Sequence, residues 1–187
     1  KTFSKLGAEV TLKDPPLEGA MECFQTQRAV GLRGLGNLLE KTIPNWREFA
    51  KDTATWNIEK GFGLTIEDMI RAEATRTRIF EDISEYFRDF DALLLPAAQV
   101  PPFDLSQEWI SEIEGIKLDT YIDWMSVCCM ITVTGLPAIS VPGGFTEEGL
   151  PVGIQLVGKP NGDLELLKIA NAYEAMTKHY ARTPELF

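Results

Sequence analysis

The sequence contains few of the side chains that most often bind metals. It has one histidine, His179, and three cysteines. Cys128 and Cys129 are adjacent, so on a helix their side chains point about 100° apart and cannot chelate one ion well, and Cys23 is distant in the sequence. We therefore expect no metal site and no disulfide framework, and the low cysteine content favours a reducing, cytoplasmic location.

The sequence also lacks long apolar runs and clusters of basic residues. The most apolar stretch, Thr120 to Val133, is shorter than the roughly 20 residues that cross a bilayer. The net charge is −10, whereas nucleic acids and anionic membranes attract clustered Lys and Arg. We therefore expect neither a nucleic-acid partner nor a membrane partner.

Signatures of nucleotide binding and of common serine hydrolases are missing as well. The chain has no Walker loop, no dinucleotide-binding fingerprint and no G-x-S-x-G motif. The glycine-rich segment Gly31–Gly36 lies in a helix-like stretch and follows no strand, so we interpret it as a flexible point. Ser140 lies in a strand-like run, and His179 is not placed to complete a Ser-His-Asp triad. We therefore expect no cofactor and no triad of this kind.

The stretch that organises the chain runs from Asp119 to Gly158. Residues 120–133 predict a helix buried on most sides. Gly135 can adopt the left-handed conformation that closes a helix, and Pro137 prevents its resumption. Two strands are then expected, Ala138–Val141 and Val152–Val157, joined by a long hairpin.

Polar residues within this buried helix raise separate questions. Ser126 is expected to donate to a carbonyl one turn back. Asp119 is expected to cap the helix. Asp123 either faces the wet side of the helix or meets a partner at a pocket, because an unpaired buried carboxylate is costly.

Other elements are predicted from periodicity and from breaking residues. They are the end of a helix at residues 1–6, a strand at Ala8–Leu12, a helix at about 17–43 that is kinked or interrupted at its glycines, a helix at 46–59 capped by Asn45, a strand at Asp91–Leu95 covered on both faces, and a helix at Leu164–Lys178 capped by Asp163.

The clearest helix begins at a capping box formed by Thr65 and Asp68 and ends near Asp89. Its apolar residues recur at helical spacing and predict one buried stripe, which comprises Ile66, Met69, Ile70, Phe80, Ile83 and Phe87. Two ion pairs are expected on its solvent side, Glu67–Arg71 and Arg78–Asp82. The alternation of helices with short strands predicts an α/β domain with a polar surface excursion at about 104–118.

Two segments resemble a known family. TGLPAISVPGGFTEEGLPVGIQLVG, Thr134–Gly158, is similar to the C-terminal signature of the amidase signature hydrolases, and DALLLPAAQVPPF, Asp91–Phe103, is similar to their strand-then-proline segment. The resemblance implies part of the amidase signature fold, a mixed β-sheet core flanked by α-helices on both sides. Family chains are more than twice this long, so residues 1–187 are expected to be the C-terminal portion of a single amidase domain.

The resemblance also implies a chemistry. Enzymes of this family hydrolyse amides through a serine nucleophile, a second serine on a cis peptide and a lysine base, with an acyl-enzyme intermediate. These groups lie in a Gly/Ser-rich part that precedes the segments found here. We therefore assign no catalytic residue to this chain and expect the chain alone to be inactive.

The resemblance further implies that this region borders the acyl-binding cleft for a small-molecule amide. The expected substrate-pocket residues are Gln99, Trp124, Met125, Cys128 and Thr132. Gln99 follows the end of a strand, and the other four share a helix face. For that face core packing is the alternative interpretation. Thr132 stands where many family members carry Asn.

Two alternatives remain for the function. The chain could be a non-catalytic α/β interaction module, or it could belong to a subunit of an amidotransferase-type complex. Under the amidase hypothesis, apolar surface is left exposed on this chain, and we expect association through it, as a homo-oligomer or as aggregates.

Overall fold

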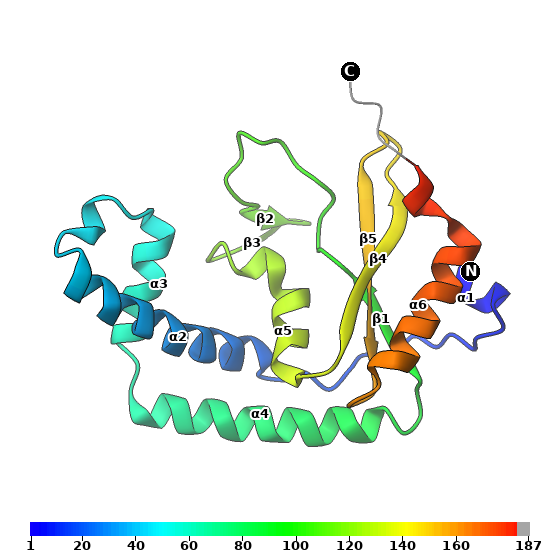
Figure 1. The fold of residues 1–187 in the computed structure, drawn as a ribbon, viewed down its shortest axis with the longest axis horizontal. Helices are drawn as coiled ribbons and strands as arrows, with labels where there is room; N and C mark the ends of the chain where they lie inside the picture. Colours follow the sequence, from blue (N-terminus) through cyan, green and yellow to red (C-terminus); the bar gives the residue numbers. More distant parts are fainter. Residues whose placement is uncertain (183–187) are drawn as a thin grey trace.

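The computed structural model describes residues 1–182, so the last five residues of the expected 1–187 domain lie outside the described part. Within this range, a three-stranded sheet runs in the order β1-β5-β4 (Figure 1). The strands are β1 (Ala92–Pro96), β4 (Ala138–Phe145) and β5 (Pro151–Gly158). Both pairings are antiparallel. The predicted hairpin between residues 138 and 157 is thus confirmed, and its strands are longer than expected.

Helices cover both faces of this sheet, which confirms the predicted fold class. On one face, α6 (Asp163–Thr177) packs Leu166, Ala170 and Tyr173 against the fully buried Leu156. On the other face, α4 (Ile66–Tyr86) and α5 (Ser126–Thr134) pack against Val157. Successive residues of a strand point to opposite faces, so the neighbours Leu156 and Val157 anchor two separate cores.

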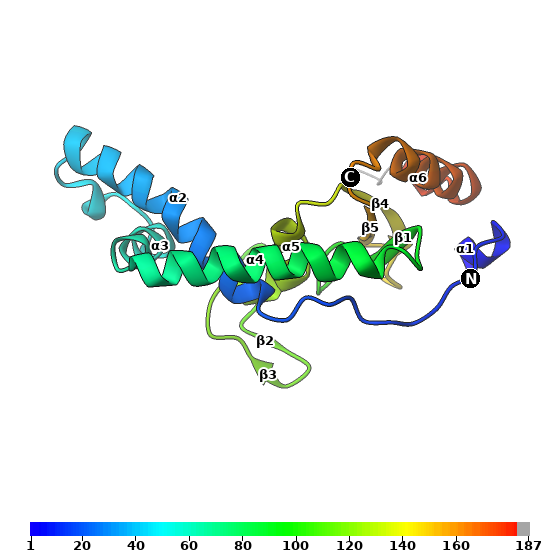
Figure 2. The ribbon, with the colours of Figure 1, turned by 90° about the horizontal axis from the view of Figure 1, so that it is seen from below.

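A helical arm extends from this body at the end opposite α6 (Figure 2). It consists of α2 (Ala20–Thr42), the 3-10 turn η1 (Trp46–Glu48) and α3 (Asp52–Phe62). The α2 helix continues through its glycines, so the predicted interruption is wrong. A Cβ added to Gly36 would lie 2.5 Å from Ile58 Cγ2. The glycine there therefore permits a close helix crossing.

Three predictions of local structure are wrong. Residues 8–12 form no strand, since no other strand lies beside them. The helix expected at 46–59 is divided between η1 and α3, and the side chain of Asn45 caps neither. Asp163 is the first residue of α6 and makes no capping hydrogen bond, because Gly162 occupies the cap position.

A short helix, α1 (Thr2–Lys5), stacks Phe3 on Tyr173 with ring centroids 5.0 Å apart.

The start of α4 is as predicted, but its apolar stripe is only partly buried. Thr65 Oγ1 accepts from Asp68 N at 3.1 Å, and Asp68 Oδ2 accepts from Thr65 N at 3.0 Å, which confirms the capping box. Ile83 is fully buried, whereas Ile66 and Ile70 are 71% and 64% exposed. The predicted burial is therefore wrong for the first turns of the helix and for Phe80, which is 47% exposed.

The ion pairs of α4 follow the predicted spacing in one case out of two. Arg78 pairs with Asp82 at 3.2 Å, as predicted. Arg71 pairs with Asp68 at 2.5 Å rather than with Glu67. The capping carboxylate therefore serves both the helix start and this arginine.

Residues 104–118 form an exposed excursion that contains a small hairpin, β2 (Glu112–Ile113) with β3 (Ile116–Lys117). The turn η2 (Asp123–Met125) then leads directly into α5. Among residues 1–182, no helix combines the length and the apolar character needed to cross a bilayer.

Candidate functional site

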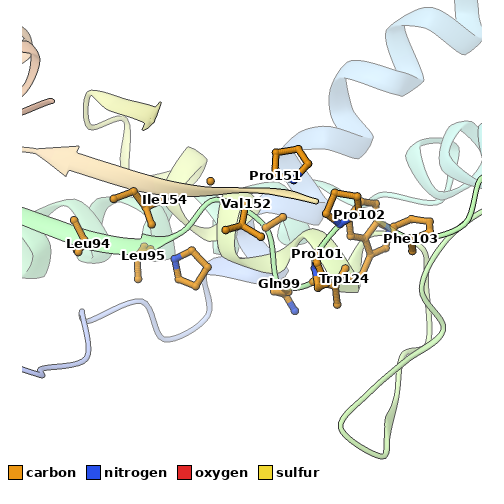
Figure 3. Close-up of a pocket in the computed structure, with 14 residues that line it drawn as sticks. Leu94, Leu95, Gln99, Pro101, Pro102, Phe103, Trp124, Pro151, Val152 and Ile154 are labelled. Atoms are coloured by element: carbon orange, nitrogen blue, oxygen red, sulfur yellow. The ribbon is translucent and has the colours of Figure 1, made fainter. Parts of the chain in front are cut away.

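A pocket of about 720 Å³ opens at the C-terminal end of β1, beside the start of β5 (Figure 3). Its wall is formed by the two strands, by the proline-rich segment after β1, and by η2. The residues that line it are Leu94, Leu95, Pro96, Ala98, Gln99, Val100, Pro101, Pro102, Phe103, Trp124, Pro151, Val152, Gly153 and Ile154.

The segment after β1 is held in place by hydrogen bonds to the start of α5. Gln99 Oε1 accepts from Ser126 Oγ at 2.7 Å and from Val127 N at 3.2 Å. Cys128 Sγ donates to Ala97 O at 3.0 Å. The first N–H groups of a helix have no partner within the helix, so the Gln99 amide oxygen supplies one. The prediction that Ser126 bonds to a carbonyl one turn back is therefore wrong.

The close approach of this segment to β5 depends on Gly153. Ala97 N donates to Gly153 O at 3.1 Å. A Cβ added to Gly153 would lie 2.9 Å from Ala97 Cβ and 3.2 Å from Ser140 Oγ. A larger residue would push the proline-rich segment away from the sheet. Gly153 therefore shapes the floor of the pocket.

Aromatic rings close one end of the pocket. Phe103 meets Trp124 edge to face, with ring centroids 5.5 Å apart. In Figure 3 these two rings lie at one end and Leu94 and Leu95 at the other, with Gln99 between them. Phe103 immediately precedes the exposed excursion, and Trp124 lies in η2, just before α5. The contact therefore joins the two ends of a segment of about 20 residues at the pocket.

The predicted pocket residues divide into two groups in the structure. Gln99 and Trp124 line the pocket, whereas Met125, Cys128 and Thr132 are not among its lining residues. Met125 and Cys128 are partly buried. Thr132 is exposed, and its hydroxyl donates to Cys128 O at 2.9 Å. Contact of any of the five with a substrate stays a prediction.

The two aspartates before α5 behave differently from each other. Asp123 Oδ2 accepts from Thr120 N at 2.7 Å and from Thr120 Oγ1 at 3.0 Å. Its partners thus come from its own turn, just before η2, and not from a separate partner at the pocket. Asp119 is exposed and caps neither η2 nor α5, so the prediction that it caps the helix is wrong.

Two of the three thiols, those of Cys23 and Cys129, are poorly suited to nucleophilic catalysis. Burial raises the pKa of Cys129 to about 11, and a thiol, unlike a thiolate, is a poor nucleophile. Cys23 also has a raised pKa, chiefly because it is buried. All three cysteines are free. Among residues 1–182, no three or more His, Cys, Asp or Glu side chains are grouped as a metal would require.

A polar network that the sequence did not predict holds the segment before α5 against the arm. Arg28 donates to Asn57 Oδ1, and its other terminal nitrogen donates to Tyr121 Oη at 2.6 Å. Asn57 Nδ2 donates to the same hydroxyl at 2.7 Å. Asn57 is only 4% exposed. The sequence offers one hint of this network, which is the position of Asn57 on the apolar face of a short helix.

The fold and the pocket define the class of protein. A family model described as Amidase matches residues 18–167, which include the whole sheet and every residue of the pocket. The chain belongs to the amidase family. It is 39% identical over 117 residues to a protein of Myxococcus xanthus (strain DK1622) that is named as the A subunit of glutamyl-tRNA(Gln) amidotransferase. A protein of the same name from Symbiobacterium thermophilum is 39% identical over 119 residues.

These matches cover only part of the relatives. The Myxococcus match spans 63% of this chain and 23% of that protein. A solved bacterial aryl acylamidase of the amidase signature family has a TM-score of 0.81 and 23% identity, over 96% of this chain and 39% of its own. A solved 6-aminohexanoate cyclic dimer hydrolase has a TM-score of 0.80 and 19% identity, over 98% and 41%. With 23% and 19% sequence identity, the similarity to these two solved structures shows the fold alone. That fold is the fold of the amidase signature enzymes.

Proposed function

We propose that the protein carrying this chain hydrolyses carboxylic amide C–N bonds, and that residues 91–158 form one wall of its substrate pocket. The observation that carries the proposal is that the whole pocket lies within the residues matched by the amidase family model. The pocket is lined largely by the segment that follows β1, and binding residues are concentrated on loops that a rigid scaffold positions.

The proposed mechanism is acyl transfer to a serine. The serine oxygen attacks the amide carbonyl, the amine leaves with a proton, and water then hydrolyses the acyl-enzyme ester to release the acid. A second serine and a lysine would move the protons. We assign none of these groups to residues 1–187, which supply binding and positioning.

Gln99 is the residue we propose for orienting the substrate. Its oxygen is occupied by Ser126 and Val127, so its amide nitrogen is the end left to donate to a carbonyl oxygen. Trp124 would pack against the acyl part. We propose that Met125, at the end of η2, and Cys128 and Thr132, on α5, border the same cleft.

Labelling with a serine-reactive fluorophosphonate followed by mass spectrometry tests the mechanism. We expect the intact protein to carry one labelled serine outside residues 1–187, and labelling to abolish amide hydrolysis. Amide hydrolysis by the purified 1–187 chain, abolished by changing one of its own serines, would overturn the proposal.

A second candidate is a component of an amidotransferase-type complex in the cytoplasm. It is favoured by the names of the two relatives above. Co-purification of a tight partner that is required for amide cleavage would support this candidate. Full activity of the isolated intact protein would instead support the plain amidase.

A further inference from the structure

One buried polar group of the sheet has no partner within the described part of the chain. Gln155 lies on the central strand β5, between Leu95 of β1 and Ser140 of β4, and it is 9% exposed. Among residues 1–182, its Nε2 is the one buried side-chain nitrogen or oxygen without a hydrogen-bond partner. Most buried polar groups of native proteins have such a partner, so an acceptor is expected for this donor.

An amide at this position is unfavourable unless its nitrogen donates to an acceptor. A buried donor without an acceptor loses its hydrogen bonds to water and gains none in exchange. An apolar side chain of similar length, such as that of Met, would avoid this loss on a face that also carries Leu93, Leu95 and Val157. The glutamine therefore indicates an acceptor that meets Nε2 in the intact protein.

The open part of this face lies beside Gln155. Strand residues alternate between faces, so Gln155 shares the face of Val157, against which α4 and α5 pack. On the neighbouring strand β4, however, Ala138 and Ser140 are exposed. Ser140 Oγ lies on this same face, 3.2 Å from a Cβ added to Gly153. Among the described strands, β4 pairs with β5 alone, so the sheet is uncovered next to the unpartnered nitrogen.

We infer that Gln155 is a positioning residue whose Nε2 donates a hydrogen bond to a carbonyl oxygen of a segment outside residues 1–187, and that this segment covers the face beside β4. The chain spans 39% of the solved aryl acylamidase and 23% of the Myxococcus relative, so a protein of their length has ample further chain. An uncharged carbonyl is the favoured acceptor, because burial of a carboxylate beside apolar residues costs far more.

The contact would fix the pocket wall relative to the reacting groups. Gly153 and Ile154, the two residues before Gln155, line the pocket, and the proposed function places the reacting groups outside this chain. Misplacement by about 1 Å can reduce a rate about a hundredfold. The kinetic part of the inference rests on the proposed function, whereas the contact itself does not.

Thermal melting of the intact protein tests the contact through the sign of one substitution. Gln155→Met keeps the length of the side chain and removes the donor. If a carbonyl accepts from Nε2, the substitution leaves that carbonyl buried and unpaired, and we expect Tm to fall by about 2 °C or more. If Nε2 has no partner in the protein, Tm should stay the same or rise, and this result would overturn the inference. Gln107→Met, at an exposed position of the 104–118 excursion, is the control and should not change Tm.

Kinetics separate a positioning role from a purely structural one. The substrate is the amide that the intact protein hydrolyses fastest among acetamide, hexanamide, phenylacetamide and p-nitroacetanilide. We expect Gln155→Met to lower kcat by about tenfold or more and to change KM by less than about threefold, and Gln107→Met to change neither. A fall in Tm with unchanged kcat would support the contact and overturn the positioning role.

Failure of the proposed function has a different signature. If the intact protein hydrolyses none of the four amides and the fluorophosphonate labels no serine, the proposed function fails, and the melting comparison still decides the contact.

A crystal structure of the unchanged intact protein decides the contact if Gln155→Met does not fold. We expect Nε2 to lie within about 3.2 Å of a carbonyl oxygen outside residues 1–187. Contact with water alone, or with residues 1–187 alone, would overturn the inference.

Discussion

At the scale of single residues, Gln99 links the pocket to the helix behind it. Its carbonyl oxygen completes the hydrogen bonding of the α5 start, at Ser126 and Val127. Its amide nitrogen belongs to the other side of the same planar group. One side chain can therefore have a structural role and a binding role, and two substitutions separate them.

Gln99→Ala removes both roles, whereas Gln99→Glu keeps two acceptor oxygens and loses the donor. We expect Gln99→Ala to lower the free energy of unfolding by about 1 kcal/mol, since a helix N–H loses its partner. Gln99→Glu should melt close to the unchanged protein. In the intact protein both should raise KM for an amide. If melting falls and kinetics do not change, Gln99 is structural only.

Asn57 tests the network that joins α2, α3 and the segment before α5. We expect Asn57→Ala to lower the free energy of unfolding by about 1–3 kcal/mol, because Arg28 and Tyr121 each lose a buried partner. Asn171→Ala, at an exposed position of α6, is the control and should change it by less than about 0.5 kcal/mol. Equal free energies of unfolding for the two variants, measured by urea denaturation, would contradict the assigned role of the network.

At the scale of elements, the arm is held by close contact between α2 and α3. A Cβ added to Gly61 would lie 2.5 Å from Ala29 O and 2.9 Å from Arg33 N. Both are backbone atoms and cannot rotate away, so the helices would have to separate. In contrast, nothing lies within 4 Å of a Cβ added to Gly34.

Two alanine substitutions in the arm should therefore have opposite signs. We expect Gly61→Ala to lower the free energy of unfolding by about 1–3 kcal/mol through overpacking. Gly34→Ala should raise it by about 0.5–1 kcal/mol, because alanine restricts the unfolded chain and suits a helix interior. Chemical denaturation measures both. A loss of stability in Gly34→Ala would mean that α2 is not helical there.

The capping box of α4 should make stability depend on pH. The backbone N–H of Thr65 lowers the pKa of the Asp68 carboxyl, helped by the Thr65 hydroxyl. Because the folded pKa lies below the unfolded one, the stabilisation is present above the ordinary Asp pKa and is lost as pH falls through the folded pKa. The stability difference between the unchanged protein and Asp68→Asn should therefore shrink in acid. A difference independent of pH would contradict this assignment.

At the scale of the whole molecule, the chain exposes more surface than a compact protein of its mass. Its accessible surface is 12480 Å² for 20.9 kDa, against about 9,000 Å² expected for a compact monomer. Part of this surface is apolar. Phe49 at the tip of the arm is 77% exposed, and Ile66 and Ile70 are exposed on α4.

We therefore expect the 1–187 chain to associate with itself when it is studied alone, since exposed apolar patches promote association. Light scattering over a range of concentrations should show dimers or aggregates. The double variant Ile66→Gln, Ile70→Gln should reduce association without loss of thermal stability, because both side chains are exposed. A stable monomer at high concentration would contradict the expectation.

The elements that could be predicted from the sequence are those whose cause is local. The capping box of Thr65 needs only Asp68, three residues away. The hairpin of β4 and β5 follows from period-2 alternation on both sides of a glycine-rich turn. The helix end at Gly135 was predictable because glycine readily adopts the left-handed conformation. In the structure the φ of Gly135 is 68°. In each case the residues that form the structure are neighbours in the chain.

Only the tertiary structure decided which of these surfaces are covered and where the pocket lies. Leu94 was predicted to be covered on both faces and is 43% exposed, because no described element packs over it. Ser126 bonds to Gln99, 27 residues away, rather than within its own helix. The sequence alone determined the α/β class, the capping box of Thr65 and Asp68, the β4–β5 hairpin, the helix end at Gly135, and the family. Burial and pocket geometry depend on distant segments meeting in space, and hydrophobic periodicity does not specify which segments meet.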